Sequence, residues 1–467
     1  MNQRGDFPGL QCVSPVDGSI YATRVAADAN TIAQSIELSR SAQRQWQKTS
    51  LAERGRICEL AVQYFEQRQD QIAEEIAWQM GRPISFAGGE VKGLAERARH
   101  MMAIAEPSLA DLTPAKKAGF RRFIRRTPVG TVFTIAPWNY PLLTAVNSIV
   151  PALMAGNSVV LKPSAQVPLC GEHFVKAFES AGLPAGVLQC LFLDHQSTFK
   201  VISSGQMDFI CFTGSVAAGR QIERAAASTF AGVGLELGGK DPAYVMADAD
   251  FNDCVANLVD GAFFNSGQSC CGIERIYVHH DLFNQFVEAY VERVKQYVLG
   301  NPLQEQTTLG PVVTSAAAGW VRKQVDEAVS LGAKTCIDSS GFPHARENTP
   351  YLAPQVLIDV HHDMSVMTEE SFGPVVGIMP VSDDAEAIRL MNDSDVGLTV
   401  SLWTQDTSRA ERLGDQLEFG TVFMNRCDYL DPALAWTGVK NTGRGVTLSE
   451  LGYHQLTQPR SFHMKCT

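Results

Sequence analysis

The chain has 467 residues, more than a single hydrophobic core usually organises, so two or three domains are expected. Hydrophobic residues make up 45% of it and charged residues 19%, a balance that excludes extended disorder. The 39 basic and 50 acidic residues give a net charge of −11, which disfavours a protein dedicated to binding nucleic acid or anionic membranes.

The N-terminus, MNQRGDFPGLQC, lacks the apolar core of a signal peptide, and no apolar run approaches the length that spans a bilayer. Residues 30–80 carry apolar residues at helical spacing among many charges. From about residue 129, short apolar strands alternate with helices. We expect strands at 129–137, 158–163, 186–192, 207–214 and 233–240, and helices at 141–156, 167–182 and 215–228. Such strand–helix–strand units predict a parallel, doubly wound sheet.

A second series of alternating elements begins after residue 240. Strands are expected at 241–246 and 273–280, and helices at 251–267 and 281–298. No low-complexity linker separates the two series, and the sequence shows no internal repeat. This pattern predicts a second α/β domain that extends to about residue 440.

The segment KKAGFRRFIRR, residues 116–126, holds six basic residues in eleven positions. One interpretation is a patch that binds an anion or a nucleic acid. Because the whole chain is acidic, we favour an exposed hairpin arm with a polar face.

The eleven cysteines form no CxxC pair, which fits free thiols in a reducing compartment and hence a cytoplasmic protein. The histidine clusters at 279–280 and 361–362 lack HExxH spacing. We interpret them as solvated loop or strand-end side chains, so no metal is predicted.

Cys270 and Cys271 stand side by side after Gly267 and Gln268 in FFNSGQSCC. A cysteine nucleophile needs a lowered pKa or a nearby base, and hydrogen-bond donors aimed at the oxyanion that forms on attack. Taken alone, the pattern favours an inert structural thiol, since buried cysteines are common.

Three other stretches favour chemistry at this place. TIAPWNYP puts Asn139 at the carboxyl end of a parallel strand, where α/β proteins form their ligand crevice. LELGGK puts Glu236 beside two glycines that let a ligand approach the backbone. FTGSVAAG puts Gly214, Ser215 and Gly219 at a strand-to-helix turn, where amides and a hydroxyl can meet a phosphate. Each motif in isolation fits ordinary turn chemistry as well.

With these stretches in order, the sequence resembles the aldehyde dehydrogenase superfamily from SPVDGSIYA (14–22) to RSFHMK (460–465). The matching stretches are APWNYP, LKPS, FTGS, LELGGK, FFNSGQSCC, EESFGPV (369–375) and GTVFMN (420–425). The resemblance implies an α/β fold with three parts. They are a Rossmann-like parallel-sheet cofactor domain (1–110 and 127–238), a second α/β catalytic domain (239–440) and a small β oligomerisation arm (111–126 and 449–467).

The resemblance also implies an activity, the oxidation of an aldehyde to its carboxylic acid with NAD(P)+. Cys270 would be the nucleophile, with the Asn139 side-chain amide and the Cys270 backbone N–H as oxyanion donors. The thiohemiacetal would lose a hydride and become a thioester, which water activated by Glu236 would hydrolyse.

The expected cofactor is NAD, with NADP as a second candidate. Lys162 and Glu370 match residues that hold ribose hydroxyls, and Ser215 matches a phosphate contact. Ala165 stands where many NAD-preferring relatives carry an acid, so NADP should be accepted more readily than in those relatives. The implied cofactor-binding set is Lys162, Ser164, Trp138, Gly214, Ser215, Gly219, Leu237, Glu370 and Phe372.

The aldehyde pocket implied by the resemblance does not identify a substrate. Trp436 and Thr437, in AWTGVKNTGRG, replace the usual Phe and Gly near the aldehyde entrance. Arg426 would suit an acidic aldehyde, and it would equally suit a structural salt bridge. The expected pocket residues are Tyr140, Leu143, Asn147, Ser269 and Cys271.

Two other functions remain to be weighed. A coenzyme-A-acylating dehydrogenase is disfavoured because such relatives typically lack the base at Glu236. A non-catalytic structural or binding protein on this fold has no physical need to keep Asn139, Glu236 and Cys270 together. The expected partners are a small-molecule aldehyde and further copies of the chain, which the resemblance places in a dimer or tetramer. The closing strand QPRSFHMK would pair across subunits with the basic arm.

Overall fold

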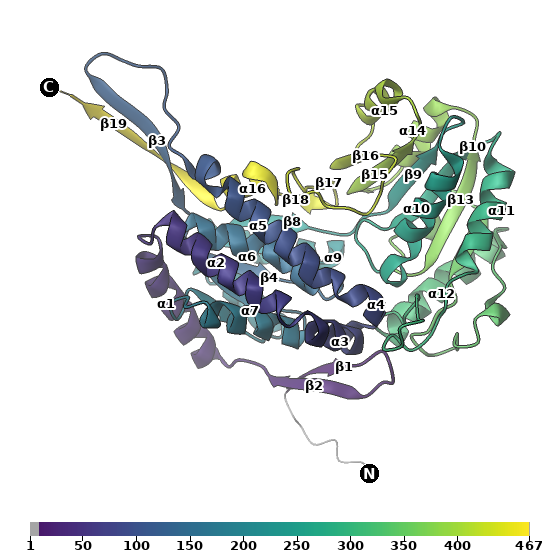
Figure 1. The fold of residues 1–467 in the computed structure, drawn as a ribbon, viewed down its shortest axis with the longest axis horizontal. Coiled ribbons are helices and arrows are strands. Elements are labelled where there is room, and N and C mark those ends of the chain that lie inside the picture. The colour runs from purple at the N-terminus through teal and green to yellow at the C-terminus, as the bar shows by residue number, and fades with distance from the viewer. Residues whose placement is uncertain (1–8, 467) are drawn as a thin grey trace, which may run out of the picture.

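The computed structural model describes residues 9–466, which form two α/β lobes and a projecting two-stranded ladder (Figure 1). The sheet of the first lobe has the order β18-β8-β7-β4-β5-β6. All neighbouring strands in it are parallel except β18, which runs antiparallel to β8. The strands are β4 (Thr131–Ile135), β5 (Ser158–Lys162), β6 (Leu188–Cys190), β7 (Phe209–Thr213), β8 (Gly232–Glu236) and β18 (Gly443–Arg444).

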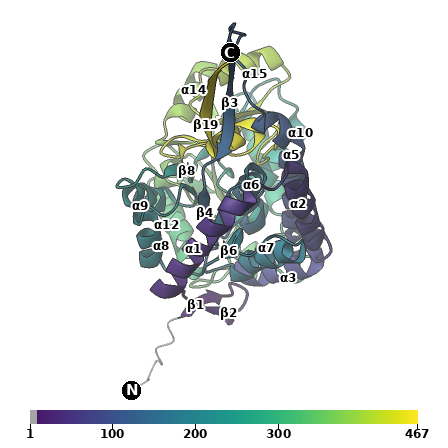
Figure 2. The same ribbon diagram turned by 90° about the vertical axis from the view of Figure 1, so that its left-hand side faces the viewer.

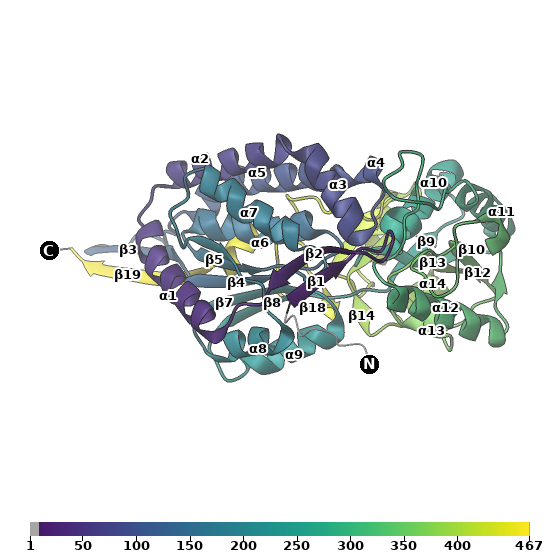
Figure 3. The same ribbon diagram turned by 90° about the horizontal axis from the view of Figure 1, so that it is seen from below.

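Helices cover both faces of this sheet (Figure 3). Alternate residues of β4 pack against different layers: Val132 faces one core, and Phe133 and Ile135 face the other. The longest helix, α5 (Gly89–Leu109), carries charged residues along its length. Among residues 9–466, no helix is both long enough and apolar enough to cross a bilayer. One layer contains α2 (Leu51–Glu66), α3 (Gln69–Met80), α5 (Gly89–Leu109), α6 (Pro141–Ala155) and α7 (Pro168–Ser180), and the other contains α1 (Ala29–Trp46), α8 (His195–Ser203) and α9 (Val216–Ala226).

The second lobe is built on a sheet with the order β11-β12-β13-β10-β9-β15-β16. Its strands are parallel except β11, and β9 is buried at every position, as expected for a strand with helices on both faces. The strands are β9 (Asp241–Val245), β10 (Ile273–His279), β11 (Lys334–Thr335), β12 (Gln355–Ile358), β13 (Val375–Val381), β15 (Thr399–Trp403) and β16 (Thr421–Met424). The main helices are α10 (Phe251–Phe263), α11 (Phe283–Val294), α12 (Ser315–Ser330), α14 (Asp384–Asn392) and α15 (Thr407–Gly414).

Short elements complete the chain. A hairpin of β1 (Gly9–Val13) and β2 (Ile20–Val25), which the sequence analysis did not predict, lies beside the first lobe. The others are α4 (Ile84–Ala87), the 3-10 turns at Phe264–Gly267 and Ser339–Gly341, α13 (Ser365–Thr368), β14 (Val396–Gly397), β17 (Val439–Lys440) and α16 (Ser449–Gln455).

The helix predicted at 251–267 ends earlier, at Phe263. A 3-10 turn follows, with left-handed backbone at Asn265 (φ 53°) and Ser266 (φ 57°). The apolar spacing runs on through Phe264 and therefore hides this break. Long-range contacts impose it, because Asn265 Oδ1 accepts a hydrogen bond from Arg82 Nε (2.9 Å) and Ser266 Oγ donates to Gly310 O (2.8 Å).

The ladder consists of β3 (Phe120–Pro128) and β19 (Thr457–Lys465), which run antiparallel and project beyond the helices (Figures 1 and 2). The expectation that the closing strand pairs with the basic arm across subunits is wrong, since the two strands pair within one chain. Phe123 stacks on Phe462 with ring centroids 4.4 Å apart, and this contact fixes the register. Residues 449–455 are the helix α16, so only the end of the predicted arm segment belongs to the ladder.

Candidate active site

Residues from both lobes meet at one edge of the first sheet. Because β4, β5, β7 and β8 are parallel, their carboxyl ends lie along the same edge. Asn139, Lys162, Ser215 and Glu236 lie at or just beyond these strand ends. The loop between α10 and β10 of the second lobe brings Cys270 to a cavity that Glu236 also lines.

The loop that carries Cys270 is fixed by its backbone and by Gln268. Gly267 has φ 71°, and a Cβ there would lie 2.2 Å from Gly373 O, so this close approach requires glycine. Gln268 Nε2 donates to Asn265 O (3.1 Å), and its Oε1 accepts from Val313 N (2.7 Å). The tight loop leaves Cys270 half-buried on the cavity wall.

The two adjacent cysteines have different environments. Cys271 is 2% exposed, and its Sγ donates a hydrogen bond to Asp428 Oδ1 (2.9 Å). The neighbouring Cys270 thiol, together with burial and the charge of Asp428, raises the pKa of Cys271 well above its usual value. Ser269 Oγ donates to the same Asp428 oxygen (3.0 Å), and burial raises the pKa of Asp428 to about 6. Cys271 is therefore held as a thiol.

Asn139 lies next to this loop, at 5% exposure. Its Nδ2 donates to Gln268 O (3.2 Å), and Asn265 Nδ2 donates to the same carbonyl (3.1 Å). The Asn139 side-chain amide is thus bound to the backbone of Gln268, two positions before Cys270. A donor to an oxyanion on the Cys270 side must be fixed in this way.

A buried ion pair that the sequence analysis missed holds Asn139 and the cysteine loop together. Arg82 is 2% exposed and Glu90 is fully buried, and Arg82 Nη1 lies 2.7 Å from Glu90 Oε1. The other nitrogens of Arg82 donate to Asn265 Oδ1 and to Asn139 O, in opposite lobes. The second Glu90 oxygen accepts from the backbone N–H groups of Leu142 (3.0 Å) and Leu143 (3.1 Å), at the start of α6.

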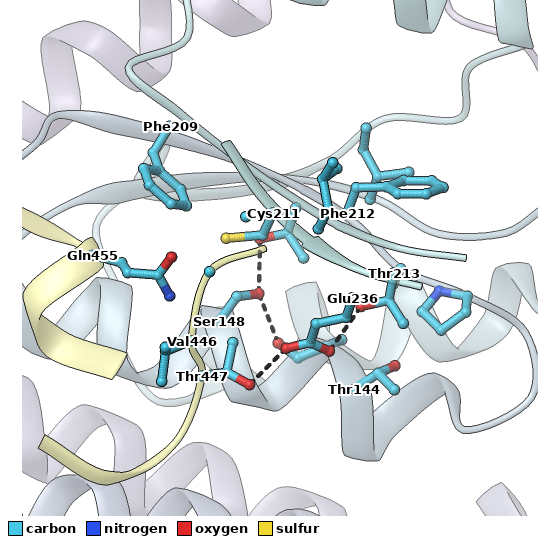
Figure 4. A pocket seen from close by; sticks show the side chains of 18 of the residues that line it. Thr144, Ser148, Phe209, Cys211, Phe212, Thr213, Glu236, Val446, Thr447 and Gln455 are labelled. Carbon is cyan, nitrogen blue, oxygen red and sulfur yellow. Dashed lines mark hydrogen bonds between the residues drawn. The ribbon is translucent and has the colours of Figure 1, made fainter. Parts of the chain in front are cut away.

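Glu236 ends β8 with both carboxylate oxygens hydrogen-bonded (Figure 4). Thr213 Oγ1 donates to Oε2 (3.1 Å) and Thr447 Oγ1 to Oε1 (2.6 Å). Burial raises the pKa of Glu236, while the two threonine hydrogen bonds and the charge of Arg97 oppose that rise. The carboxyl group borders the Cys270 cavity on one side and a small cavity of about 30 Å³ on the other.

The Cys270 cavity has a volume of about 240 Å³. Each expected pocket residue lines it: Tyr140, Leu143, Asn147, Ser269 and Cys271. So does Trp436, whereas Thr437 is turned to Gly445 O (2.7 Å), and Arg426 is exposed with its guanidinium 3.6 Å from the centre of the Tyr429 ring. Further lining residues that the sequence analysis missed include Phe86, Glu96, Arg97, Phe264, Asp428, Tyr429 and Leu430.

The four-residue spacing of a helix could have identified some of the lining residues that the sequence analysis missed. Gly89, Gly93 and Arg97 recur at intervals of four and all line the cavity from α5. Leu143 fills the space beside Gly93, where a Cβ would lie 2.3 Å from Leu143 Cδ2. Asp428 offers no comparable signal, because it lies in an irregular loop after β16.

The expected cofactor residues of the second lobe lie against the LELGGK stretch. Glu370 Oε1 accepts from Gly239 N (3.1 Å), and burial raises the pKa of Glu370 to about 8. Any Cβ at Gly238 would lie 2.3 Å from Glu370 Oε2, so the glycine pair allows this contact. Phe372 packs edge-on against Trp138 with ring centroids 5.5 Å apart.

The strand-to-helix turn after β7 is capped by Ser215 and closely packed at its glycines. Ser215 caps α9, with its side chain accepting a hydrogen bond from Ala218 N (3.3 Å). A Cβ at Gly219 would lie 2.6 Å from the side chain of Leu237, which is one of the expected cofactor-binding residues. A larger residue at position 219 would therefore displace Leu237. Gly214 is equally close-packed against Phe212. The free N–H groups at the start of α9 favour an anion.

Lys162 ends β5, and within residues 9–466 it forms no ion pair with a carboxylate. Burial lowers the pKa of its ammonium group. Ser164 and Ala165 follow as partly buried residues, and Ser164 Oγ accepts from Gln166 N (3.3 Å). A cation of this kind without a carboxylate partner fits the ribose hydroxyls or a phosphate of a dinucleotide.

The histidine clusters lie outside this site. The potential ligand atoms of His279, His280 and Asp281 lie within 4.8 Å of one another at the end of β10. His362 is engaged otherwise, with its ring hydrogen-bonded to Tyr277 Oη (2.8 Å) and to Asp393 Oδ2 (2.6 Å).

Comparisons with known proteins identify the family to which the chain is similar. The model of the aldehyde dehydrogenase family matches residues 3–462. An aldehyde dehydrogenase of Paenarthrobacter nicotinovorans is 34% identical over 449 residues, which cover 96% of this chain and 97% of the relative. An NADP(+) succinate-semialdehyde dehydrogenase of Mycobacterium avium (strain 104) is 34% identical over 412 residues, 86% of this chain and 85% of the relative. The solved succinic semialdehyde dehydrogenase from Streptococcus pyogenes, in complex with NADP+, superposes with a TM-score of 0.93 at 26% identity, covering 97% of this chain and 99% of that one.

The Arg82–Glu90 pair generates a stability prediction. Glu90→Ala leaves the Arg82 charge buried without its partner, so the free energy of unfolding should fall by about 3–5 kcal/mol. Urea-induced unfolding measures the change. Glu53→Ala breaks the exposed Arg56–Glu53 pair (2.7 Å) and serves as the control, with an expected change of less than about 1 kcal/mol. Equal losses in the two variants would contradict a structural role for the buried pair.

Proposed function

Because this chain belongs to the aldehyde dehydrogenase family, we propose that Cys270 is the nucleophile with which it oxidises an aldehyde to the carboxylic acid. The observation that carries this proposal is the difference between the two cysteines. Cys270 is half-buried on a cavity that Glu236 also lines, whereas Cys271 is 2% exposed and hydrogen-bonded to Asp428.

In the first step the Cys270 thiolate adds to the aldehyde carbon, and the carbonyl oxygen becomes an oxyanion. The Asn139 Nδ2 group and the Cys270 backbone N–H donate to that oxyanion. The hydrogen bonds from Arg82 to Asn139 O and Asn265 Oδ1 support the required geometry, because they hold both donor segments in place.

NAD(P)+ supplies the acceptor for the hydride that leaves the thiohemiacetal. Lys162, Ser164 and Glu370 would hold its ribose hydroxyls, and Ser215 with the glycines of the FTGSVAAG turn would hold its phosphates. Trp138, Leu237 and Phe372 would line its cleft. The unpaired Lys162 ammonium and the free amides at the start of α9 support this assignment.

In the last step Glu236 removes a proton from water, and the hydroxide attacks the thioester on Cys270. The C–S bond breaks, the carboxylic acid leaves, and the thiolate is restored. The raised pKa of Glu236 makes it a stronger base than a solvated carboxylate, while its bonds to Thr213 and Thr447 hold it in position.

The two alternative functions have less support. Transfer of the acyl group to coenzyme A does not need a base beside the thioester, yet Glu236 lines the same cavity as Cys270. A purely structural protein has no use for a partly accessible thiol, a buried amide and a carboxylate gathered around a cavity of about 240 Å³.

The two succinate-semialdehyde dehydrogenases named above are described with NADP(+), and we infer that this chain accepts both NAD and NADP. We assign the cofactor domain to residues 1–110 and 127–238 and the catalytic domain to 239–440. A cytoplasmic location is proposed on the ground that all eleven cysteines are free.

The two cysteines can be separated by mutation. Cys270→Ala should abolish aldehyde oxidation, because it removes the nucleophile. Cys271→Ala should retain most turnover, with a changed substrate preference, since its side chain lines the cavity. Steady-state reduction of NAD(P)+ measures both, and loss of activity only in the Cys271 variant would overturn the assignment.

Removal of the base should separate the two half-reactions. Glu236→Gln keeps the nucleophile, so one turnover should release reduced cofactor before the thioester stalls. A rapid-mixing experiment measures that burst, and mass spectrometry of the intact protein should find an acyl adduct on Cys270. Undiminished steady-state turnover would rule out Glu236 as the essential base.

Ala165→Glu should restore discrimination against NADP. A carboxylate there would hydrogen-bond a 2′-hydroxyl and repel a 2′-phosphate, so kcat/KM for NADP should fall by about tenfold or more while that for NAD holds. Ala165→Gln, which adds bulk without charge, is the matched control. If the glutamate leaves the NADP value untouched, the adenosine ribose does not lie beside residue 165.

We propose that a second copy of the chain covers the β3–β19 ladder. A two-stranded ladder that projects from the body is marginally stable by itself, and its outer edges remain open to pairing. Light scattering at micromolar concentration should give the mass of a dimer or tetramer. The mass of a 50.8 kDa monomer would contradict the proposal.

A further inference from the structure

Arg97 lies on the wall of the Cys270 cavity with part of its guanidinium unpaired. Its side chain is 8% exposed, and Nη1 donates to Leu143 O (2.8 Å) and Asn147 Oδ1 (3.4 Å). Within residues 9–466, Nε and Nη2 have no hydrogen-bond partner, and no carboxylate lies within ion-pair distance. Buried charges in proteins are normally paired, so the free nitrogens of the Arg97 guanidinium are available to a ligand.

The contrast with Arg82 makes the difference clear. Arg82 lines the same cavity and is also buried, but its Nε, Nη1 and Nη2 all donate to protein oxygens, including a carboxylate oxygen of Glu90. Arg82 therefore serves the fold. Arg97 has no such carboxylate, and it keeps two donors that the fold does not use.

A second unused donor lies beside Arg97. Asn147 is 3% exposed, and among the residues that the structure describes its buried Nδ2 has no hydrogen-bond partner. Its Oδ1 faces Arg97 Nη1, which turns the amide nitrogen away from the guanidinium. Both residues line the cavity, so one wall of it offers positive charge and N–H groups only.

The three carboxylates that line the cavity are already engaged. Glu236 accepts hydrogen bonds from two threonine hydroxyls, and Glu96 Oε1 accepts one from Tyr429 Oη (2.9 Å). Asp428 Oδ1 accepts hydrogen bonds from Ser269 Oγ (3.0 Å) and Cys271 Sγ (2.9 Å), so this carboxylate helps to fix the loop beside Cys270. Arginine, by contrast, stays protonated at every physiological pH. The free recognition capacity of the cavity is therefore for an anion.

We propose that the substrate is a short aldehyde that carries a carboxylate, and that this carboxylate binds Arg97 Nε and Nη2 with Asn147 Nδ2 as an additional donor. The inference rests on the proposed function for the aldehyde end, which Cys270 attacks. A planar guanidinium fork matches a carboxylate in a bidentate pair, which gives direction as well as affinity. Arg97 thus selects the substrate by its carboxylate, at the end of the molecule opposite the aldehyde.

The test compares three aldehydes of similar length: 4-oxobutanoate, neutral pentanal and cationic 4-trimethylammoniobutanal. The wild-type enzyme should have its highest kcat/KM with 4-oxobutanoate. Arg97→Gln should lower that value on the order of 100-fold, mainly through KM, and leave pentanal within about threefold. Arg97→Lys should fall between them, because it keeps the charge and loses the fork.

Arg99→Gln is the matched control, since Arg99 lies on the same helix and pairs with Glu59 and Glu66 on the surface. It should behave as the wild type. Calorimetry with succinate, in the absence of any aldehyde, should show binding to the wild type and to Arg99→Gln and a loss of binding in Arg97→Gln.

Two results would overturn the inference. An equal loss for pentanal and 4-oxobutanoate would mean that Arg97 supports Cys270 and Glu236 instead of the substrate. A preference for the cationic aldehyde would assign selection to Asp428. If no aldehyde is oxidised while succinate still binds through Arg97, the proposed function fails and the anion site stands.

Discussion

The ion pair between Arg82 and Glu90 is the interaction on which the site depends. Arg82 reaches Asn139 from the first lobe and Asn265 from the second, and Glu90 holds the first turn of α6 through two backbone N–H groups. Asn139 and the cysteine loop come from different lobes. The buried Arg82–Glu90 pair therefore sets the distance between these two segments. The free-energy cost of removing the two charges from water is offset because the Arg82 nitrogens and both Glu90 oxygens are hydrogen-bonded.

Charges of both signs share one cavity without cancelling one another. Glu236 is held by two threonine hydroxyls, Asp428 by Ser269 and Cys271, and Arg97 by a carbonyl and an amide oxygen. In a site with little water, electrostatic interactions are stronger than at the surface. Separate anchoring keeps each of these charged groups at its own place on the cavity wall.

The sequence predicted the elements whose order follows from local pattern. Asn139 was expected at the carboxyl end of a parallel strand, Ser215 at a strand-to-helix turn and Glu236 beside two glycines. Lys162 was added by the family resemblance, and the structure brings all four to one edge of the first sheet. The roles assigned to them stay predictions.

The remainder depends on contacts that no local pattern encodes. Arg82 and Glu90 look like ordinary surface charges in sequence, yet both are buried by α6 and by a loop nearly two hundred positions away. The break after Phe263 was hidden for the same reason, since Asn265 is turned by Arg82 and not by its neighbours. The sequence could not distinguish pairing of β3 with β19 within one chain from pairing between two chains. The residue-to-residue register of the two strands is the same in both cases.

The strand β18 pairs with β8, so the last part of the polypeptide finishes the first sheet. The same region adds two more ties, from Asn157 Nδ2 to Leu456 O (2.9 Å) and from Tyr453 Oη to Met101 O (2.6 Å). During synthesis the first lobe leaves the ribosome long before residues 443–456 exist, and its sheet edge at β8 stays uncovered until β18 has been made. The early lobe is therefore an incomplete folding unit in the nascent chain, and its open edge is most exposed to wrong pairing in the interval before β18 appears.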